Sequence, residues 1–434
     1  MFQPRGFDDL AGRRVGVYGI GIEGRATLAR LATVTNDVVA VDDVLGPPDA
    51  LTTNQGGLDA LLTCDVVIKS PGISPLLASV QSLREAGLLV TSALNLWCTD
   101  DRRHRVIAVT GTKGKSTTTS LITFALHALG EVAQGVGNIG HPPYDPAFVD
   151  EGGWLVLELS SFQSVDLTVA PARIVVTALG SDHLDWHGSL DAYRDDKLSV
   201  ARLPQPHHTF VADSALLRDS HDALGDDVRY VGPDHSTLAA DLHLLGDHSR
   251  SNVALAIAVV AHATGLTREE VEAAMRRSAA TFVPLRGRLT PVGTVDGVAF
   301  VDDGLATSAL PTIAALDVFA NEPVALLCGG FDRGVDYAPL GEALASRTRP
   351  TTLVVMGPAG ERIADVVRHS PQVRVIAVLT MTDAVKAGSE ALREGGVVLF
   401  SPAAPSFDRY TNWLERSEDF VACVTALAPT KGLH

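Results

Sequence analysis

The sequence predicts an α/β protein of three domains, and three observations lead to this fold class. Short apolar segments typical of buried strands alternate with segments of helical spacing along the whole chain. The chain has 434 residues, which exceeds the roughly 250–300 residues that one hydrophobic core serves. Hydrophobic residues make up 46% of the chain and charged residues 20%, which is enough apolar material for several cores.

The first domain is expected over residues 1–98 and is predicted to be Rossmann-like. Residues 14–21 (RVGVYGIG) are a strand-like run that ends in glycines, and residues 23–32 (EGRATLARLA) follow with helical spacing. Further strands are expected at residues 37–43 (DVVAVDD) and 64–73 (CDVVIKSPGI). Strands that alternate with helices predict a parallel sheet with helices on both faces.

The second domain is expected over residues 99–290 and contains a second α/β series on a parallel sheet. Residues 104–111 (HRVIAVTG) predict a strand, and the helix after it, over residues 115–130, ends at a likely capping glycine, Gly130. The later elements are two buried strands and an apolar helix, at residues 154–160 (WLVLELS), 173–180 (RIVVTALG) and 250–265 (RSNVALAIAVVAHATG).

The third domain is expected over residues 291–434 and is again Rossmann-like. Helical stretches separate most of its strand-like runs. These runs are residues 297–303 (GVAFVDD), 324–330 (VALLCGG), 352–357 (TLVVMG), 373–379 (VRVIAVL) and 396–402 (GVVLFSP).

Charge and composition exclude several classes of partner. The net charge of −16 argues against a nucleic-acid surface, which normally presents a basic patch. No run of 18 apolar residues occurs, so we expect no membrane span. The N-terminus lacks the apolar core of a secretory signal. The four cysteines are scattered, which favours isolated reduced thiols in a cytoplasmic protein over disulfides or a zinc site; they are Cys64, Cys98, Cys328 and Cys423.

A glycine-rich turn between the strand at 104–111 and the following helix predicts a nucleotide site. Glycines let backbone N–H groups face an anion, the helix N-terminus adds favourable partial charge, a lysine reaches the terminal phosphates, and a hydroxyl can hold magnesium. The alternative is a glycine-rich turn of purely structural role with an exposed lysine. A common P-loop has glycine where this chain has Val109, so ordinary NTPase families fit poorly. The predicted ATP-binding residues are Gly111, Thr112, Lys113, Gly114, Lys115, Ser116 and Thr117.

This variant turn, TGTKGKST, resembles the P-loop of the Mur ligases and folylpolyglutamate synthetases. The motifs that follow in order resemble the glutamate-adding Mur ligases, and together they cover almost the whole chain: residues 137–140 (GNIG), 158–163 (ELSSFQ), 181–185 (SDHLD) and 191–197 (DAYRDDK). The resemblance implies a ligase that uses ATP and magnesium to join glutamate to UDP-N-acetylmuramoyl-L-alanine through an acyl phosphate in peptidoglycan synthesis. It also implies a cytoplasmic monomer without a nucleic-acid or membrane partner.

Four residues are expected to hold metal ions or act in catalysis. Glu158 ends an apolar strand near the P-loop, where a carboxylate can hold magnesium with Ser116; a buried structural acid is the alternative. On their own, His183 would be a structural or surface histidine and Lys197 a solvated helix residue. The resemblance implies that His183 binds a second metal ion, that Lys197 becomes carbamylated to ligate it, and that Lys115 serves the phosphoryl transfer.

The nucleotide substrates are expected to contact several further residues. The turn at 19–24 (GIGIEG) alone suggests a dinucleotide site, but nothing else in the sequence indicates hydride chemistry, and the resemblance implies that UDP binds there. The implied UDP-substrate residues are Gly19, Gly21, Glu23, Gly24, Asp42, Ser70, Asn138 and Ser160. The implied ATP contacts are Asn252 in a segment similar to GxHNxxN, Arg288 at the phosphates and Asp303 at the ribose; a surface ion pair is the alternative for Arg288.

The glutamate pocket is expected in the third domain, at Thr307, Arg333, Ser406 and Trp413. The largest departure from the family is Leu305, because D-glutamate ligases usually have a lysine there. An apolar side chain cannot pair with a carboxylate. The chain is therefore either an L-glutamate ligase, whose product would go to a separate epimerase, or a D-glutamate ligase in which Arg333 supplies the charge. The sequence is compatible with both interpretations.

Two other functions are compatible with parts of the sequence. A folylpolyglutamate-type ligase fits the P-loop but not the N-terminal GIGIEG domain, because those enzymes begin with the ATP domain. A non-catalytic nucleotide-binding paralogue is disfavoured because Lys115, Glu158, His183 and Lys197 are all present.

Overall fold

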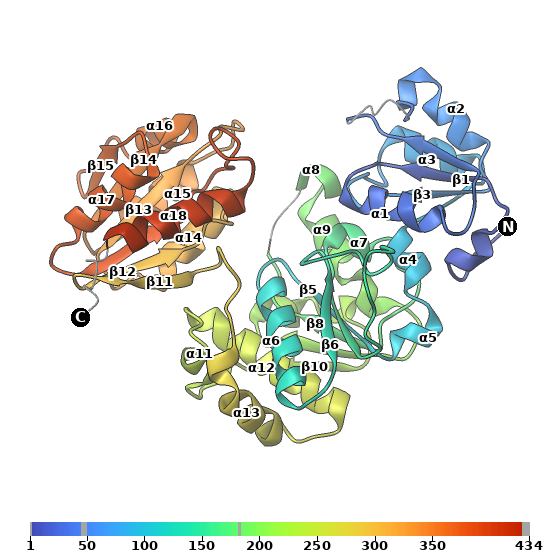
Figure 1. Ribbon diagram of the computed structural model, residues 1–434, viewed down its shortest axis with the longest axis horizontal. Coiled ribbons are helices and arrows are strands. Elements are labelled where there is room, and N and C mark those ends of the chain that lie inside the picture. The colour runs from blue at the N-terminus through green and yellow to red at the C-terminus, as the bar shows by residue number, and fades with distance from the viewer. Residues whose placement is uncertain (1, 45–49, 181–183, 428–434) are drawn as a thin grey trace, which may run out of the picture. The chain divides into compact units, whose positions relative to one another are not determined.

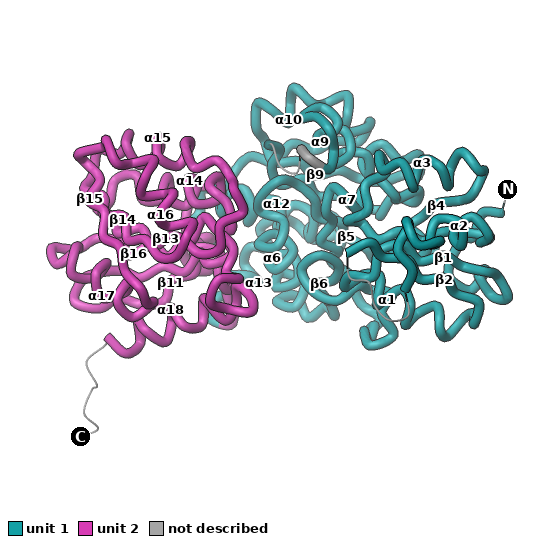
Figure 2. Tube along the Cα trace, turned by 90° about the horizontal axis from the view of Figure 1, so that it is seen from above, with its two compact units in different colours: residues 1–238, 248–280 teal, residues 239–247, 281–434 magenta. Residues whose placement is uncertain are grey.

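The computed structural model describes residues 2–44, 50–180 and 184–427, and these residues form three β-sheets (Figure 1). Two compact units contain them: residues 1–238 with 248–280, and residues 239–247 with 281–434 (Figure 2). The α/β class with parallel sheets in three successive stretches of chain is confirmed. The domain boundaries near residues 98 and 290 stay predictions. In the described part of the chain, no helix combines the length and apolar character needed to cross a bilayer.

The first sheet has four parallel strands in the order β2-β1-β3-β4. They are β1 (Val15–Tyr18), β2 (Val38–Val41), β3 (Val66–Lys69) and β4 (Leu89–Thr91). The strand β4 was not predicted, because three residues are too few to show periodicity. The helices are α1 (Ile22–Leu31), α2 (Gly57–Leu62), α3 (Ala78–Glu85), α4 (Ala93–Trp97) and α5 (Asp100–Arg103), with one-turn 3-10 helices η1 (Phe7–Leu10) and η2 (Thr53–Gln55).

The second sheet has six strands in the order β10-β9-β8-β5-β7-β6, and every neighbouring pair is parallel. The strand β5 is internal and lies between β8 and β7. The strands are β5 (Val106–Thr110), β6 (Ala133–Gly137), β7 (Trp154–Glu158), β8 (Arg173–Val176), β9 (His208–Ala212) and β10 (Val228–Val231). The strands β6, β9 and β10 were not predicted, because glycine, polar or charged residues interrupt their apolar runs.

Helices of the second region begin and end close to the predicted positions. The helix α6 (Lys115–Ala128) is followed by Gly130, whose φ of 84° confirms the predicted capping glycine. The apolar helix α12 begins three residues earlier than expected. The remaining bounds are α7 (Ser161–Ser164), α8 (Leu184–His187), α9 (Leu190–Leu198), α10 (Ala215–Asp219), α11 (Leu238–Asp241), α12 (Asp247–Thr264), α13 (Arg268–Arg277), η3 (Ser199–Arg202), η4 (His221–Ala223) and η5 (Ala279–Thr281).

The third sheet has the order β11-β12-β16-β13-β14-β15, and it is parallel except for the edge strand β11. The hairpin from β11 (Thr290–Val295) to β12 (Val298–Asp302) turns through Asp296 and Gly297, whose φ angles are 49° and 80°. Asp-Gly is a strong hairpin signal, so this missed strand was detectable. The others are β13 (Val324–Gly329), β14 (Thr351–Met356), β15 (Val373–Ala377) and β16 (Gly396–Phe400).

Helices cover both faces of the third sheet (Figure 1). In β13, Leu326 and Cys328 pack into a core with α14, α15 and α16, whereas Ala325 and Leu327 pack into a second core with α17 and α18. This alternation follows from the two-residue period of a strand. The helices are α14 (Ala309–Val318), α15 (Ala338–Ser346), α16 (Gly357–Val366), α17 (Met381–Ala391) and α18 (Trp413–Leu427).

A buried ion pair joins the first sheet to the chain after α7. The ammonium of Lys69, at the end of β3, donates to Oδ2 of Asp166 at 2.5 Å, and their side chains are 0% and 3% exposed. Two buried opposite charges in contact stabilise each other, but removal of one leaves the other uncompensated. This pair therefore makes the packing of the first sheet sensitive to either residue.

We predict that Asp166→Asn lowers the free energy of unfolding by about 3 kcal/mol, because Lys69 then keeps a buried charge without its carboxylate. Calorimetric melting measures the change. The control is Asp8→Asn, which removes a carboxylate that is 94% exposed and pairs with Arg30 at 3.2 Å; its effect should be close to zero. Equal melting temperatures for the two variants would contradict the prediction.

Candidate active site

The turn between β5 and α6 has a backbone that only glycine adopts without strain. Gly111 has a φ of 141° and Gly114 a φ of 87°. A Cβ added to Gly111 would lie 2.2 Å from Oγ1 of Thr177, and one added to Gly114 would lie 2.7 Å from Oδ1 of Asn252. The turn is therefore packed tightly against the chain after β8 and against α12, which places Asn252 beside the predicted P-loop.

Two lysines converge on one carbonyl group of this turn. The Nζ atoms of Lys115 and Lys197 each lie 3.0 Å from the oxygen of Gly111, and Nζ of Lys115 also lies 3.3 Å from the oxygen of Thr112. Lys197 is buried, and its Nζ lies 4.9 Å from the ring centroid of Tyr193. Two ammonium groups beside the N-terminus of a 14-residue helix create a positive potential suited to phosphate.

Hydrogen bonds hold the remainder of the turn in place. The N–H of Thr112 donates to the oxygen of Ala178 at 2.7 Å, and the hydroxyl of Thr112 lies 2.8 Å from that of Tyr193. The hydroxyl of Thr177 donates to the oxygen of Lys113 at 2.5 Å. Ser116 is buried and Thr117 partly buried in the first turn of α6. The seven predicted ATP-binding residues therefore comprise a turn at residues 111–114, fixed by hydrogen bonds, and the first three residues of α6.

Glu158 lies on the strand next to the P-loop strand. Its register partner on β5 is Val109, and its side chain is buried. Oε1 of Glu158 accepts a hydrogen bond from Nδ2 of Asn138 at 2.8 Å, so two predicted site residues meet here. Oε2 is buried and has no hydrogen-bond partner among the described residues. A buried carboxylate oxygen without a donor fits a divalent cation, which takes oxygen ligands.

The predicted second metal site falls partly outside the described residues, because His183 lies in the stretch 181–183. Among the residues that the structure does describe, no group of three histidine, cysteine, aspartate or glutamate side chains could hold a metal ion. The roles of His183 and Lys197 in metal binding stay predictions.

A buried histidine that was not predicted joins the elements around Lys197. Nε2 of His187 lies 3.0 Å from the hydroxyl of Ser161, and Nδ1 lies 2.7 Å from Oδ2 of Asp196. Ser161 begins α7 and Asp196 precedes Lys197 in α9. The rings of Phe162, Trp186 and Tyr193 surround His187. Since both Ser161 and His187 are only 3% exposed, this Ser-His-Asp set is a structural connection and not a nucleophile. Its members are close only in the fold, so spacing gave no signal.

The turn after β1 also requires glycine. Gly19 has a φ of 92°, and a Cβ added to Gly24 would lie 2.0 Å from the oxygen of Gly19. The hydroxyl of Ser70 donates to that same oxygen at 2.6 Å. Around Gly21, the N-cap residue of α1, no atom of the described residues other than its chain neighbours lies within 4 Å of an added Cβ. Four predicted UDP-substrate residues thus meet at an accessible helix N-terminus, where an anion is favoured.

Three other residues predicted to bind this substrate have protein partners. The oxygens of Glu23 accept from the hydroxyl of Tyr144 at 2.8 Å and from Nε2 of Gln163 at 2.7 Å. Oδ2 and Oδ1 of Asp42 accept from the N–H groups of Ile20 at 2.6 Å and Val44 at 2.8 Å. Ser160 forms a capping box with Gln163 at the start of α7. In this structure Glu23 and Asp42 shape the turn and its connection to the central sheet.

The other two predicted ATP contacts belong to the second compact unit. Oδ1 of Asp303 accepts from the N–H of Leu289 at 3.3 Å, and Oδ2 accepts from the hydroxyl of Ser401 at 2.8 Å. Burial raises the pKa of Asp303 to about 7, while hydrogen bonding by Ser401 and the charge of Arg288 oppose the shift. Arg288 is exposed beside it. Arg288 comes just before β11 and Asp303 just after β12. Because these two strands are antiparallel neighbours, the two residues lie at the same end of the hairpin.

The predicted glutamate residues follow three neighbouring strands of the third sheet. Thr307 is exposed after β12, Arg333 is exposed after β13 with its guanidinium 5.8 Å from the ring centroid of Phe407, and Ser406 is buried after β16. Because carboxyl ends of parallel strands meet at one edge, the three share that edge of the sheet.

The position that departs from the family lies beside the fourth predicted glutamate residue, Trp413. The N–H of Leu305 donates to the oxygen of Gly287 at 3.1 Å. A Cβ added to Gly287 would lie 2.7 Å from Cζ3 of Trp413 and 3.3 Å from the nitrogen of Leu305. The indole ring thus packs against the backbone next to Leu305, which makes this side of the edge apolar.

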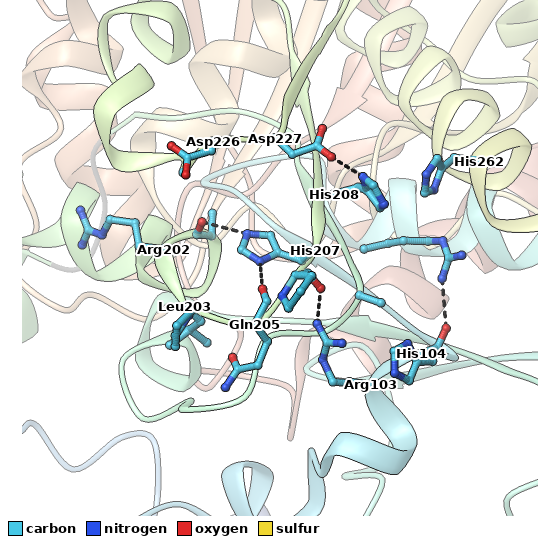
Figure 3. A pocket seen from close by; sticks show the side chains of 16 residues that line it. Arg103, His104, Arg202, Leu203, Gln205, His207, His208, Asp226, Asp227 and His262 are labelled. Atoms are coloured by element: carbon cyan, nitrogen blue, oxygen red, sulfur yellow. Dashed lines mark hydrogen bonds and ion pairs between the residues drawn. The ribbon is translucent and has the colours of Figure 1, made fainter.

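A pocket of about 760 Å³ lies at the edge of the central sheet where its strands begin (Figure 3). The predicted P-loop follows β5 at the other edge of this sheet, where the strands end. The residues that line it include none of those predicted for the site. Its basic groups have internal partners: Arg103 donates to the oxygens of Ala170 and Pro206, and His208 pairs with Asp227 at 2.5 Å. Burial lowers the pKa of His262 to about 4, so this ring is neutral. The pocket is therefore not a candidate for the anionic substrates.

Comparison with known proteins gives one consistent result. Residues 109–218 match the family description "Mur ligase middle domain". A UDP-N-acetylmuramoyl-L-alanine–L-glutamate ligase of a Micromonospora species is 38% identical and covers 96% of this chain and 97% of its own. A protein of that name from Salinispora tropica is 37% identical, with coverage of 96% and 98%. In fold, the chain is similar to the UDP-N-acetylmuramate–alanine ligase MurC of Thermotoga maritima, with a TM-score of 0.57 at 19% identity over 95% of this chain and 99% of that one.

We predict that Asp303→Asn stabilises the protein at pH 8 and has little effect near pH 4. The unfolded carboxyl has a pKa of about 3.9, whereas burial raises the folded pKa to about 7. Between these values the folded state keeps a proton that the unfolded state has released, so stability falls as pH rises and is lowest above pH 7. Asparagine removes this loss, and the gain should be on the order of 2 kcal/mol.

Melting temperatures of both proteins at pH 4, 6 and 8 measure this difference. The control is Asp365→Asn, an exposed aspartate of the same unit that pairs with Arg368. If Asp303→Asn and the control respond to pH in the same way, the buried charge of Asp303 is not the cause.

Proposed function

This chain belongs to the Mur ligase family, and we propose that it joins L-glutamate to UDP-N-acetylmuramoyl-L-alanine in peptidoglycan synthesis, with hydrolysis of ATP to ADP and phosphate. The proposal rests on one observation above all, the rigid turn at 111–117 with two lysines on the Gly111 carbonyl and the Glu158 carboxylate on the next strand. The names and the almost complete coverage of the relatives in Micromonospora and Salinispora support the choice of substrates.

The proposed reaction has two steps. A carboxylate oxygen of the alanine unit attacks the γ-phosphorus in line and ADP leaves, which gives an acyl phosphate. The amine of glutamate then attacks the acyl carbon, loses a proton and expels phosphate through a tetrahedral intermediate. Positioning and charge neutralisation account for most of the catalysis in such transfers. Lys115 neutralises the migrating phosphoryl group, and Arg288 is proposed to do so from the second unit.

Magnesium is the proposed metal ion, and it would neutralise charge on the ATP phosphates when bound. The buried Oε2 of Glu158 and the hydroxyl of Ser116 would hold it. His183 and a carbamylated Lys197 are proposed for a second ion. The crowding of two ammonium groups at the Gly111 oxygen supports this modification, because a carbamate at Lys197 would replace like-charge repulsion with attraction toward Lys115.

The substrates are proposed to bind at separate strand ends. UDP would lie at the N-terminus of α1, near Gly19, Gly21, Gly24 and Ser70, in a domain spanning residues 1–98. Adenine would lie near Asn252, which contacts Gly114 of the ATP-binding domain at 99–290, and the ribose near Asp303. Glutamate would bind in the domain at 291–434.

We propose L-glutamate because of the apolar surroundings of Leu305. Trp413 packs beside it, so the side chain at position 305 offers no cation to a glutamate carboxylate. Arg333 carries an exposed cation at the same edge, and its use requires a different arrangement of the two carboxylates. The product would then be the substrate of a separate epimerase. We further propose that the enzyme is a monomer and that it acts in the cytoplasm. Its four free cysteines support this reducing compartment.

We predict that Lys115→Ala lowers the turnover number on the order of 10²–10³-fold, because the ammonium of Lys115, held at the Gly111 carbonyl at the start of α6, is the charge proposed to neutralise the transferred phosphoryl group. Phosphate release in the presence of all three substrates measures it. The control is Lys386→Ala, an exposed lysine on α17, which should keep full activity. Near-normal turnover in Lys115→Ala with an unchanged melting temperature would refute the role of Lys115.

A competition between the two enantiomers of glutamate tests the substrate. With equal amounts of mass-labelled L- and D-glutamate, we expect nearly all of the product to carry the L form. Leu305→Lys restores a charge at the apolar position and should weaken this preference, whereas Leu310→Lys, at a leucine that is 52% exposed, should not. Incorporation of D-glutamate alone by the unaltered protein would end the L-glutamate proposal.

A further inference from the structure

Arg416 is a buried cation whose guanidinium group touches three loops. It lies on α18, and its residue is 3% exposed. Nη2 donates to the oxygen of Ala404 at 2.9 Å and to that of Gly304 at 3.3 Å, and Nη1 donates to the oxygen of Gly329 at 3.3 Å. A planar group with several N–H donors can bridge three acceptors in this way, and a lysine cannot.

The three loops are those that carry the predicted glutamate residues. Gly304 follows β12, Gly329 ends β13 and Ala404 follows β16, and these strands are neighbours in the order β12-β16-β13. Thr307, Arg333 and Ser406 come three, four and two residues after these contact points. The guanidinium group therefore fixes the spacing of the strand ends from which the pocket is built.

The packing around the guanidinium group leaves little freedom. A Cβ added to Gly330 would lie 2.9 Å from Nη1 of Arg416, and Gly330 has a φ of 138°. Among the described residues, Arg416 donates to backbone carbonyls and to no carboxylate, and its buried Nε has no hydrogen-bond partner. Burial lowers the pKa of Arg416 to about 10, so the group keeps its charge at neutral pH. A buried charge held by carbonyl groups and the face of the Phe400 ring, 5.8 Å away, without an ion pair, is costly for stability alone.

Arg347 shows the same chemistry at the other end of the sheet. Its guanidinium donates to the oxygens of Leu316 at 3.1 Å, Phe319 at 2.9 Å and Glu322 at 2.8 Å. These carbonyls precede β13, at the amino-end edge, where no glutamate residue is predicted. Arg347 is thus a matched control for the structural part of the role of Arg416.

We propose that Arg416 is a positioning residue for glutamate, which holds the loops of Thr307, Arg333 and Ser406 at the spacing that the two carboxylates require. This inference rests on the proposed ligase function. The cost of keeping a charged group buried is offset by a defined geometry at the carboxyl-end edge, where the loops would otherwise move independently.

The test compares Arg416→Lys, Arg416→Met and Arg347→Lys in the full chain. Michaelis constants are measured for glutamate, ATP and UDP-N-acetylmuramoyl-L-alanine, together with turnover and melting temperature. We expect both Arg416 variants to raise the KM for glutamate at least about tenfold, which corresponds to about 1.4 kcal/mol, and to leave the other two constants within about twofold. Arg347→Lys should lower the melting temperature but leave every KM unchanged.

The outcomes separate this inference from the proposed function. If the unaltered protein does not use glutamate, the proposed function fails first. If it does use glutamate, two results would show that Arg416 is merely structural. One is that Arg416→Lys raises all three Michaelis constants together, and the other is that it lowers only the melting temperature, as Arg347→Lys does. Arg416→Met avoids an unpaired buried charge and covers the case in which the lysine variant does not fold, because KM does not depend on the amount of folded enzyme. If neither variant folds, the positioning role is rejected in favour of a structural one.

Discussion

The convergence of Lys115 and Lys197 on the carbonyl oxygen of Gly111 is the interaction on which the rest of the site depends. It requires the φ of 141° at Gly111, which only glycine adopts without strain, and it requires α9 to lie against the turn. The hydrogen bonds of His187 to α7 and α9 keep that helix in place. Because β7 pairs with β5 in parallel, the Glu158 carboxylate then ends beside the same turn.

Elsewhere in the molecule, side chains also hold the loops that follow parallel strands. Each sheet brings its loops to one edge, but nothing in a sheet fixes the loops relative to one another. Ser70 fastens the glycine turn after β1, Ser401 holds Asp303 after β12, and Arg416 connects the loops after β12, β13 and β16. Ser70 and Arg416 donate to loop carbonyls and so replace hydrogen bonds that the backbone would make with water, whereas Ser401 donates to the Asp303 carboxylate.

The sequence predicted the architecture well because continuous apolar runs of four to six residues mark strands that are buried on both faces, as in β5 and β13. It failed where that signal was weak, at β4, β6, β9 and β10, and it overlooked the Asp-Gly turn before β12. Within the site, the family resemblance identified Asn138 and Asn252, which lie beside Glu158 and Gly114 in the structure. It could not reveal His187 or Arg416, whose partners are distant in sequence, nor that Glu23 and Asp42 have partners within the protein.

The residues at 111–117 are proposed to promote the transfer of the γ-phosphoryl group from ATP to the substrate carboxylate. This is tested most directly with UDP-N-acetylmuramoyl-L-alanine carrying ¹⁸O in the alanine carboxylate. If an acyl phosphate forms, one of these oxygens must leave with phosphate, because the amine displaces it at the acyl carbon. We expect one ¹⁸O atom in each phosphate released during ligation of L-glutamate. Release of phosphate without ¹⁸O, while the amide product accumulates, would contradict the account.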